Sequence, residues 1–386
     1  MKKILASMAI LAGMWSVNSF AIVDGEIVTD TTAKSRVAIR SSDMAELPHC
    51  TGTLVAPNWV LTAAHCLVFP LENGDYKVLH PSDLSISVRS ITLTGVGTGD
   101  VYVPSHVIIY PKYTRYSESK LGNDNQVELK ALELDHDVAL IRLENSVRIS
   151  GVSPVTLASN DEMKVIEEEL NEDWKTHNRN NERSENVVGY GWGFTDANAS
   201  VATDSLRKGN FTFYPTADCY VRLTSDESFP ALMGGPWNTS KICTLPSSPR
   251  DLGSAVGTLY GVHVCNGDSG GPLMYERNGK NIQIGIASGV PLLQPNCGSY
   301  TKPAFYAKVS TYYGWIQSYV ANDKIPSEKV VLPDVVIDAR EELEHKENCK
   351  EGISTRNCNF KQPDGASAPG LWFLMAIGLL GWIRRK

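Results

Sequence analysis

Two short segments that lie far apart in the sequence limit the folds open to this chain. Residues 265–273 read CNGDSGGPL and centre on Ser269, and residues 62–66 read TAAHC and contain His65. A serine hydroxyl is a poor nucleophile at neutral pH, so it needs an imidazole to take its proton and a carboxylate to orient that imidazole. The fold must therefore bring distant stretches of the chain to one place if the two segments act together.

The candidate carboxylate is Asp137, which opens the segment DVALI. The neighbouring Asp135 lacks the Val-Ala-Leu context that follows Asp137, so Asp137 is preferred. With His65, Asp137 and Ser269 in that order, roughly residues 22–322 resemble the chymotrypsin family of serine endopeptidases. The resemblance implies an all-β fold of two antiparallel Greek-key barrels, about residues 22–150 and 151–309, followed by a helix at about 310–321. It also implies protein or peptide substrates and no metal or organic cofactor.

The same resemblance assigns roles to the neighbours of Ser269. The backbone N–H groups of Gly267 and Ser269 would form an oxyanion hole, in which each donor contributes roughly 2.7–4 kcal/mol to the transition state. In the family, a freed α-ammonium pairs with the aspartate before the nucleophile, which is Asp268 here. Residues 22–25 read IVDG and resemble the family's Ile-Val-Gly-Gly opening, so Ile22 would supply that ammonium. Ser288 resembles the serine that starts the substrate-binding strand and hydrogen-bonds the catalytic carboxylate.

The specificity pocket differs from that of trypsin. Trypsin-like enzymes hold an aspartate six residues before the nucleophile, where this chain has His263, and the wall positions are Val290 and Ala304. None of these residues is a carboxylate, so cleavage after Lys or Arg is disfavoured. Either Gly289 replaces the usual tryptophan and Val290 narrows the pocket for small aliphatic side chains, or the tryptophan is deleted and Gly289 lines the pocket. A charged His263 would instead favour acidic side chains at low pH.

Composition excludes some functions and leaves the type of β fold open. The chain has 386 residues, 42% of them hydrophobic, which is enough to bury a large core. Its net charge of −7, with no cluster of basic residues before the last three, argues against nucleic acid as a partner. Short strand-like runs are separated by Gly, Pro and Asn, and this pattern by itself allows a sandwich as well as a pair of barrels.

The eight cysteines favour disulfides. They lack the short paired spacing of zinc sites and follow an export signal, which indicates an oxidising compartment. Spacing cannot choose among the possible pairings. Three pairs are implied by the family resemblance, and a fourth is proposed from the cysteines that remain: Cys50–Cys66, Cys219–Cys243 and Cys265–Cys297, then Cys349–Cys358.

Residues 1–21 are predicted to be a secretory signal peptide. They begin MKK, continue through an apolar run and end with small residues at Ser19 and Ala21. Cleavage by signal peptidase after Ala21 would create the Ile22 terminus directly, although family zymogens usually carry Lys or Arg at that point. The alternatives are a permanent anchor helix, or a cut elsewhere that leaves a propeptide before Ile22. The predicted location is secreted, cell-surface or periplasmic.

The C-terminal region is predicted to be a tail. Residues 323–364 are charged and punctuated by proline, which predicts a linker that carries one cysteine pair. Residues 365–386 contain 13 consecutive apolar or glycine residues, 371–383, followed by RRK. A spanning helix normally needs ~20 apolar residues, so the segment resembles a bacterial C-terminal sorting signal that an intramembrane protease removes. The alternative is a permanent transmembrane anchor.

The function predicted from the sequence is that of an exported serine endopeptidase that works through an acyl-enzyme. Two polar segments, 113–134 and 160–185, exceed the family core and are predicted to be surface insertions. The rival interpretation is a catalytically silent binding protein on the same scaffold, tethered to the surface by its tail. A complete set of His65, Asp137 and Ser269 argues against silence.

Overall fold

The computed structural model describes most of the chain after the predicted signal peptide. The predicted signal peptide, Cys358 and the segment 365–386 lie outside the described residues, so the structure does not bear on them or on the pairing of Cys349. The described residues are 22–29, 31–42, 47–89, 91–93, 100–116, 118–121, 127–131, 133–178, 182–224, 232–252, 259–291 and 295–350.

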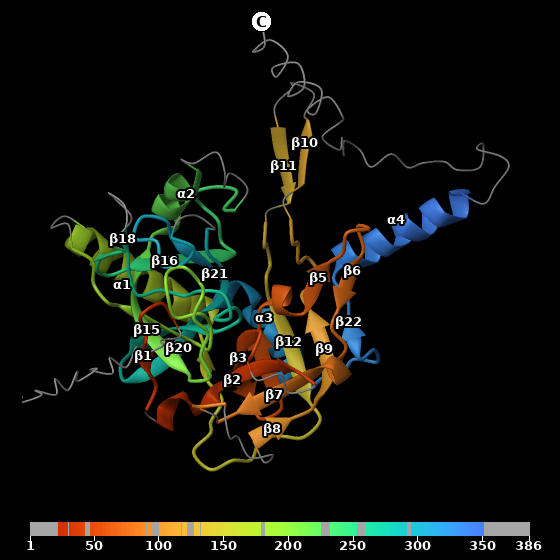
Figure 1. The fold of residues 1–386 in the computed structure, drawn as a ribbon, viewed down its shortest axis with the longest axis horizontal. Helices are drawn as coiled ribbons and strands as arrows, with labels where there is room; N and C mark the ends of the chain where they lie inside the picture. Colours follow the sequence, from red (N-terminus) through yellow and green to blue (C-terminus); the bar gives the residue numbers. More distant parts are fainter. Residues whose placement is uncertain are drawn as a thin grey trace, which may run out of the picture.

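Two eight-stranded sheets form the body of the molecule (Figure 1). The first has the strand order β22-β9-β12-β4-β3-β2-β7-β8 and is antiparallel except where β22 joins β9. The strands next to its two ends, β7 and β9, contact each other but are not paired within the described residues, so this barrel is open. The strands are β2 (Arg36–Ser41), β3 (Cys50–Ala56), β4 (Trp59–Thr62), β7 (Leu84–Val88), β8 (Val101–Tyr102), β9 (Pro104–Ile109), β12 (Ala139–Leu143) and β22 (Val330–Val331).

The second sheet closes on itself. Its order is β15-β14-β19-β20-β21-β16, and β16 pairs back with β15. The predicted all-β fold with two antiparallel barrels is thus confirmed, with one barrel closed and the other open. The strands are β1 (Glu26–Ile27), β13 (Thr156–Leu157), β14 (Val187–Gly191), β15 (Arg207–Tyr214), β16 (Lys241–Pro246), β19 (Pro272–Arg277), β20 (Lys280–Gly289) and β21 (Ala304–Lys308).

Smaller elements decorate the two barrels. The hairpin of β10 and β11 lies within the predicted insertion 113–134 and stands out from the body in Figure 1. The small hairpins are β5 (Val68–Pro70) with β6 (Tyr76–Val78), β10 (Glu118–Leu121) with β11 (Val127–Ala131), and β17 (Arg250–Asp251) with β18 (Leu259–Tyr260). The helices are η1 (Thr31–Ser35), η2 (Ala64–Cys66), η3 (Pro81–Asp83), α1 (Asn160–Asn178), α2 (Thr216–Thr224), α3 (Val309–Val320) and α4 (Asp334–Lys350).

Strand β2 shows how one sequence run serves two cores. Successive strand residues point to opposite faces, so Val37 and Ile39 face one way and Ala38 the other. Val37 and Ile39 pack into the core of the first barrel, whereas Ala38 packs with Trp192 and other residues of a separate cluster. Full burial of an aliphatic side chain such as Val37 or Ile39 is worth about 1.5–3 kcal/mol. One face of β2 therefore packs in the core of the first barrel, and the other packs against the cluster that contains Trp192.

Helix α1 differs from the predicted surface insertion. Met163, Ile166 and Leu170 recur at helical spacing and are buried in the core of the second barrel. The opposite face carries the charges that suggested a solvated segment. Glu167 on this helix also pairs with Lys308 at 2.6 Å. The helix is therefore part of the barrel wall, because its apolar stripe needs the barrel to cover it.

The C-terminal helix is present as predicted, and the chain continues past it on the first barrel. Val309 and Ile316 of α3 pack into the first barrel's core. Residues 323–364 were expected to be a linker, but the described part behaves differently. Strand β22 pairs with β9, and Val336 of α4 is fully buried in the same core. The apolar residues of this segment outweigh its charged composition and hold it on the barrel.

Three predicted disulfides are confirmed: Cys50–Cys66, Cys219–Cys243 and Cys265–Cys297. The first ties η2 to β3, and the second ties α2 to β16. The third holds the segment that leads into Ser269. All three fit a protein that folds in an oxidising, extracellular environment.

Candidate active site

Asp137 and His65 form a buried hydrogen-bonded pair at the edge of the first barrel. His65 Nδ1 lies 2.7 Å from Asp137 Oδ2, and the backbone N–H of His65 donates to Asp137 Oδ1 at 2.9 Å. The hydroxyl of Ser288 donates to the same carboxylate at 2.6 Å. Asp137 is fully buried, and 14% of the His65 side chain is exposed. The carboxylate therefore fixes the imidazole from one side and leaves its Nε2 edge toward the pocket.

The pKa of Asp137 reflects a balance between burial and its partners. Burial alone would raise the pKa of this carboxyl, but attraction to His65 and the hydrogen bonds from His65 and Ser288 outweigh it. The net pKa lies below the ordinary value, so Asp137 is ionised at neutral pH. The stability that these bonds contribute is present above the unfolded-state pKa and is lost as pH falls through the folded-state pKa.

The loop that carries Ser269 is held by both barrels. Thr51 of β3 donates its N–H to the Ser269 carbonyl at 2.8 Å and its hydroxyl to the Gly267 carbonyl at 3.1 Å. From the second barrel, the Ala287 carbonyl accepts the N–H of Gly270 at 2.8 Å. Ser269 and His65 line the same pocket, and no hydrogen bond joins their side chains within the described part of the chain. Such catalytic bonds are often long in a free enzyme and tighten with substrate.

Gly267 occupies a position that requires glycine. Its φ of +93° lies in the left-handed region, and a Cβ built on it would be 2.7 Å from the Gly193 Cα. Among the described residues, the N–H groups of Gly267 and Ser269 have no protein acceptor. Both residues line the pocket. Two unpaired donors on one tight loop can bind an anionic oxygen placed there.

Asp268 points away from the pocket into the protein. Its Oδ1 accepts the N–H of Gly193 at 2.9 Å and its Oδ2 that of Cys265 at 2.8 Å. Burial raises the pKa of Asp268 to about 7, and these two bonds only partly oppose that effect. No cation contacts the carboxylate within the described residues. The site therefore favours a positive group that would stabilise the ionised form.

The predicted partner of Asp268, Ile22, is also buried. Its side chain is fully covered in the core of the second barrel. The following Val23 donates its N–H to the His263 carbonyl at 2.8 Å, and Asp24 donates to Thr195 at 3.0 Å. Ile22 and Val23 are thus buried in the protein and do not lie on its surface.

The pocket draws its lining from both barrels. Several segments that are distant in the sequence contribute. The lining residues are His49, Cys50, His65, Cys66 and Phe69; Arg115, Tyr116, Glu133 and Leu134; Leu232, Val264, Cys265, Asn266, Gly267 and Ser269; and Ala287, Ser288, Gly289, Val290, Pro291 and Phe305. The pocket residues missed by sequence reasoning include Phe305, Leu134 and Leu232, and no motif marks them.

His263 does not line this pocket, which corrects the predicted specificity residue. The side chain is 1% exposed, its Nε2 lies 2.8 Å from the Thr244 hydroxyl, and its ring packs against Phe211. Burial lowers the pKa of His263 to about 3, and a hydrogen bond to the backbone of Thr244 opposes this only in part. His263 is therefore neutral at ordinary pH, and the charged form that would favour acidic substrates does not arise.

Ala304 is likewise absent from the pocket lining. It is 1% exposed and belongs to the core of the second barrel. Its neighbour Phe305 points the other way, as alternation along β21 requires, and lines the pocket. Among the predicted substrate-binding residues, Ser288, Gly289 and Val290 do line it.

The space beside Gly289 is filled by Phe305. The two residues pair across β20 and β21, and a Cβ built on Gly289 would lie 2.4 Å from Phe305 Cζ. Any side chain at 289 would displace that ring. Ser288 contacts Asp137 as predicted, and Gly289 follows it directly, which fits both a replaced and a deleted tryptophan. An aromatic ring is thus retained at this wall, supplied by the neighbouring strand.

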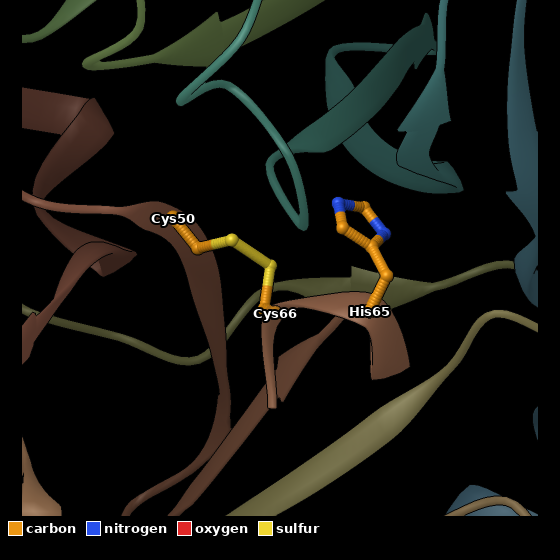
Figure 2. A group of neighbouring side chains, drawn as sticks. All are labelled: Cys50, His65 and Cys66. Atoms are coloured by element: carbon orange, nitrogen blue, oxygen red, sulfur yellow. A yellow bond between two sulfur atoms is a disulfide. The ribbon is translucent and has the colours of Figure 1, made fainter. Parts of the chain in front are cut away.

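Cys50, His65 and Cys66 lie close together, but they do not make a thiolate metal site. Their possible ligand atoms are all within 4.8 Å of one another. Figure 2 shows the two sulfurs joined in a disulfide with the imidazole alongside. Disulfide sulfurs lack the thiolate charge on which a metal site of this kind depends. The cluster is better explained as a covalent support for η2, which carries His65.

A sequence model of the Trypsin family matches residues 22–316. The chain belongs to the trypsin family. It is 25% identical over 296 residues to ovochymase of Halocynthia roretzi, an alignment that covers 76% of this chain and 15% of that protein. It is 26% identical over 292 residues to hepatocyte growth factor activator serine proteases of Canis lupus familiaris, with 72% of this chain and 34% of that protein covered. The chain therefore spans well under half the length of these two relatives.

Family membership implies protein or peptide substrates and supports a protease. It does not extend to the tail that follows the matched residues. Within the described residues, no helix combines the length and the apolar character that crossing a bilayer requires.

Proposed function

We propose that this trypsin-family chain is an exported serine endopeptidase that cleaves peptide bonds through an acyl-enzyme. The observation that carries the proposal is the hydrogen-bonded series from Ser288 through Asp137 to His65, which faces Ser269 across one pocket. The unpaired N–H groups of Gly267 and Ser269 supply the complementary site for the developing oxyanion.

In the first half of the reaction, Ser269 is acylated. Its Oγ attacks the scissile carbonyl carbon while its proton passes to His65 Nε2, and the carbonyl oxygen becomes the oxyanion held by Gly267 and Ser269. The carbon–nitrogen bond then breaks, and His65 gives the proton to the leaving amine. Asp137 keeps the proton on His65 Nδ1 throughout and stabilises the imidazolium. In the second half, water attacks the acyl carbon and gives a proton to His65. The bond from the acyl carbon to Ser269 Oγ then breaks, His65 returns the proton to Oγ, and the acid product leaves.

A fluorophosphonate probe tests this proposal directly. The probe phosphonylates an activated serine, so the wild-type chain is expected to be labelled at Ser269. Prior treatment with denaturant should abolish labelling, because the reaction depends on the folded His65–Asp137 pair. A folded chain that takes up no probe would support the rival, a silent binding protein on the same scaffold.

The proposed activation step uses Ile22 and Asp268. Cleavage before Ile22 would free an α-ammonium that is proposed to pair with Asp268, a carboxylate whose burial raises its pKa to about 7. Because the pKa of Asp268 is raised in the folded state, the folded form of an uncleaved chain binds more protons than its unfolded form between about pH 4 and 7. The free energy of unfolding of the uncleaved chain therefore falls as pH rises through that window. When the ammonium of Ile22 pairs with the ionised Asp268, this loss of stability no longer occurs. The pair would also order the loop of Gly267 and Ser269.

Asp268→Asn is therefore expected to have opposite effects in two forms of the chain. In a form that starts at Ile22, activity should fall about 10²–10⁴-fold, which matches the ~3–5 kcal/mol cost of breaking a buried pair. In a form with one added residue before Ile22, the substitution should raise stability at pH 8 by about 2 kcal/mol, because no buried charge is left unpaired. Activity assays and thermal unfolding at pH 5 and pH 8 measure both effects.

Asp196→Asn provides the matched control for this comparison. Asp196 also accepts several backbone N–H groups, including that of Val201 at 2.8 Å, and these hold its pKa below the ordinary value despite partial burial. Its replacement should destabilise both forms alike. If Asp268→Asn changed activity and stability equally in the form that starts at Ile22 and in the extended form, the proposed pairing of Ile22 with Asp268 would be wrong.

Specificity is proposed to favour small or apolar side chains over Lys and Arg. Glu133 is the one acidic residue among the described pocket residues, and it comes from the segment before Asp137, remote in sequence from Ser288–Val290. Val290 would narrow the pocket at the position that follows Gly289. A buried cationic side chain would find no carboxylate there.

Val290→Gly should open the pocket. The expected result is a rise of about 10-fold or more in kcat/KM for Phe relative to Ala before the scissile bond, because a few methylene groups are worth ~1–3 kcal/mol in such pockets. Peptide anilides with Ala, Val, Leu, Phe and Arg at that position measure the change. Dominant cleavage after Arg in the wild-type enzyme would contradict the proposed specificity.

Export and tail processing remain part of the proposal. A signal peptidase would cut after Ala21, and an intramembrane sorting protease would remove part of 365–386 unless that segment stays as an anchor. N-terminal sequencing and intact mass of the secreted protein distinguish these outcomes.

A further inference from the structure

Lys241 is a buried lysine that no step of the proposed reaction uses. It opens β16, is 2% exposed and ranks among the largest fully covered side chains of the described residues. Its Nζ donates to two backbone carbonyls, that of Glu133 at 2.7 Å and that of Leu232 at 2.5 Å. The ammonium also lies 4.9 Å from the centre of the Phe305 ring.

The three groups that Lys241 contacts are all parts of the pocket wall. Glu133, Leu232 and Phe305 line the pocket, and so does Leu134, which follows Glu133 directly. Lys241 itself is not among the lining residues, so it lies behind this wall. The wall has two independent sources: the segment that leads to Asp137 and the loop before β16. One side chain therefore connects two segments that are distant in the sequence.

The burial of this charge has a cost that calls for an explanation. Burial lowers the pKa of Lys241 to about 8, and the negative charges of Asp135, Asp137 and Glu133 offset only part of that effect. No carboxylate oxygen lies within ion-pairing distance of Nζ in the described residues, so the ammonium is satisfied by carbonyls and an aromatic face. Loop carbonyls that bond only water are not held in one place by it. The ammonium of Lys241 instead holds the carbonyls of Glu133 and Leu232 at fixed positions.

Neighbouring bonds reinforce the same connection. Ser240 donates its hydroxyl to Asp135 Oδ1 at 2.9 Å. Asn238 donates to the Met233 carbonyl at 2.9 Å and accepts the Lys241 N–H at 2.8 Å. The start of β16 thus holds the 133–135 segment on one side and the 232–233 segment on the other.

We propose that Lys241 is a positioning residue that holds the 133–134 segment and Leu232 beside Phe305, so that Leu134, Leu232 and Phe305 form an apolar wall for substrate side chains next to the strand Ser288–Val290. The inference rests on the proposed protease function. Lys241 acts through the wall and does not touch the reacting atoms. Its loss should therefore weaken the binding of extended apolar substrates and leave the chemistry at Ser269 intact.

Lys241→Met tests the proposal, because methionine keeps much of the volume and removes both the charge and the donors. With a four-residue anilide substrate rich in Leu and Phe, KM is expected to rise about 10–50-fold with little change in kcat, as loss of uniform substrate binding requires. With a single-residue ester, kcat/KM should stay within about two-fold of wild type. Unchanged KM for the long substrate, or equal losses on both substrates, would overturn the proposal.

Lys308→Met is the matched control. Like Lys241, Lys308 is a mostly buried lysine. It lies just before helix α3, and its partner is Glu167 of α1, away from the pocket wall. It should lower stability without changing the ratio of long- to short-substrate KM values. Leu134→Ala should reproduce the Lys241→Met pattern, since it shortens the wall itself.

Two further measurements keep the result interpretable. Labelling of Ser269 by a small fluorophosphonate reports the proposed function separately: labelled Lys241→Met with normal KM refutes the positioning role, whereas an unlabelled wild type refutes the protease. If Lys241→Met fails to fold, Lys241→Gln retains a donor for one carbonyl and is judged by the same KM ratio.

Discussion

Ser269→Ala is expected to lower kcat/KM about 10⁶-fold, the scale seen when a serine protease loses its nucleophile. The reason is that alanine cannot form the acyl-enzyme, so neither His65 nor the oxyanion donors have a covalent step to assist. A residual rate of about 10³–10⁴ over water should remain from the Gly267 N–H group and substrate binding. Hydrolysis of a peptide anilide and loss of fluorophosphonate labelling measure the effect.

Non-additivity provides a sharper check on Ser269. His65→Ala should cost nearly as much as Ser269→Ala, and the double variant little more than either, because the side chains act as a unit. Ser299→Ala is the matched control: among the described residues, its part-buried hydroxyl bonds only the near neighbours Thr301 and Lys302, so activity should be unchanged. Additive losses in the double variant would mean that His65 and Ser269 do not act together.

The fold could be predicted because its signals are local and repeated. The segments around His65, Asp137 and Ser269, with strand-like runs between them, led to an all-β structure of two barrels, and the structure has it. The three implied disulfides also form. The strand pattern by itself allowed a sandwich as well as two barrels, and it could not decide closure. Pairing of β15 with β16 closes one barrel, while β7 and β9 do not pair with each other within the described residues, and that depends on how distant strands meet.

The specificity pocket was predicted less well because burial is a property of the folded chain. His263 occupies the family position, yet Thr244 and Phe211 enclose it and the pocket does not reach it. Phe305 was missed for the complementary reason: it follows Ala304 in an apolar strand and carries no motif. Only the pairing of Gly289 with Phe305 reveals that the ring fills the space a tryptophan would need.

Composition misled in two segments where a minority of residues decides the structure. In α1, the stripe of Met163, Ile166 and Leu170 at helical spacing was available in the sequence and could have indicated a buried face. In the supposed linker, Val330 and Val331 complete an edge of the first barrel. A few apolar side chains are enough to dock such segments, because a neighbouring strand edge supplies the backbone partners.

Asp137→Asn is expected to lower kcat about 10⁴-fold, the loss known for this substitution in the serine protease triad. The carboxylate accepts from His65 Nδ1 at 2.7 Å, from the His65 N–H at 2.9 Å and from Ser288 at 2.6 Å. An amide there can donate to Nδ1, which moves the imidazole proton to Nε2 and leaves His65 unable to take the proton of Ser269. The shape of the site is unchanged, so KM should change little.

Ser288→Ala distinguishes the effect of the negative charge of Asp137 from the effect of the hydrogen bond that Ser288 donates to it. It removes one of the three hydrogen bonds but keeps the carboxylate, so kcat should fall by only about 10-fold, consistent with ~1.5 kcal/mol for a bond to a charged group. Its pH response adds a second reading. With one bond fewer, the pKa of Asp137 should move up toward its ordinary value, so the acid loss of stability should begin at higher pH than in the wild type. Acid unfolding curves and kcat are measured on the same samples of both variants. An Asp137→Asn enzyme as active as Ser288→Ala would show that the carboxylate does not set the tautomer of His65.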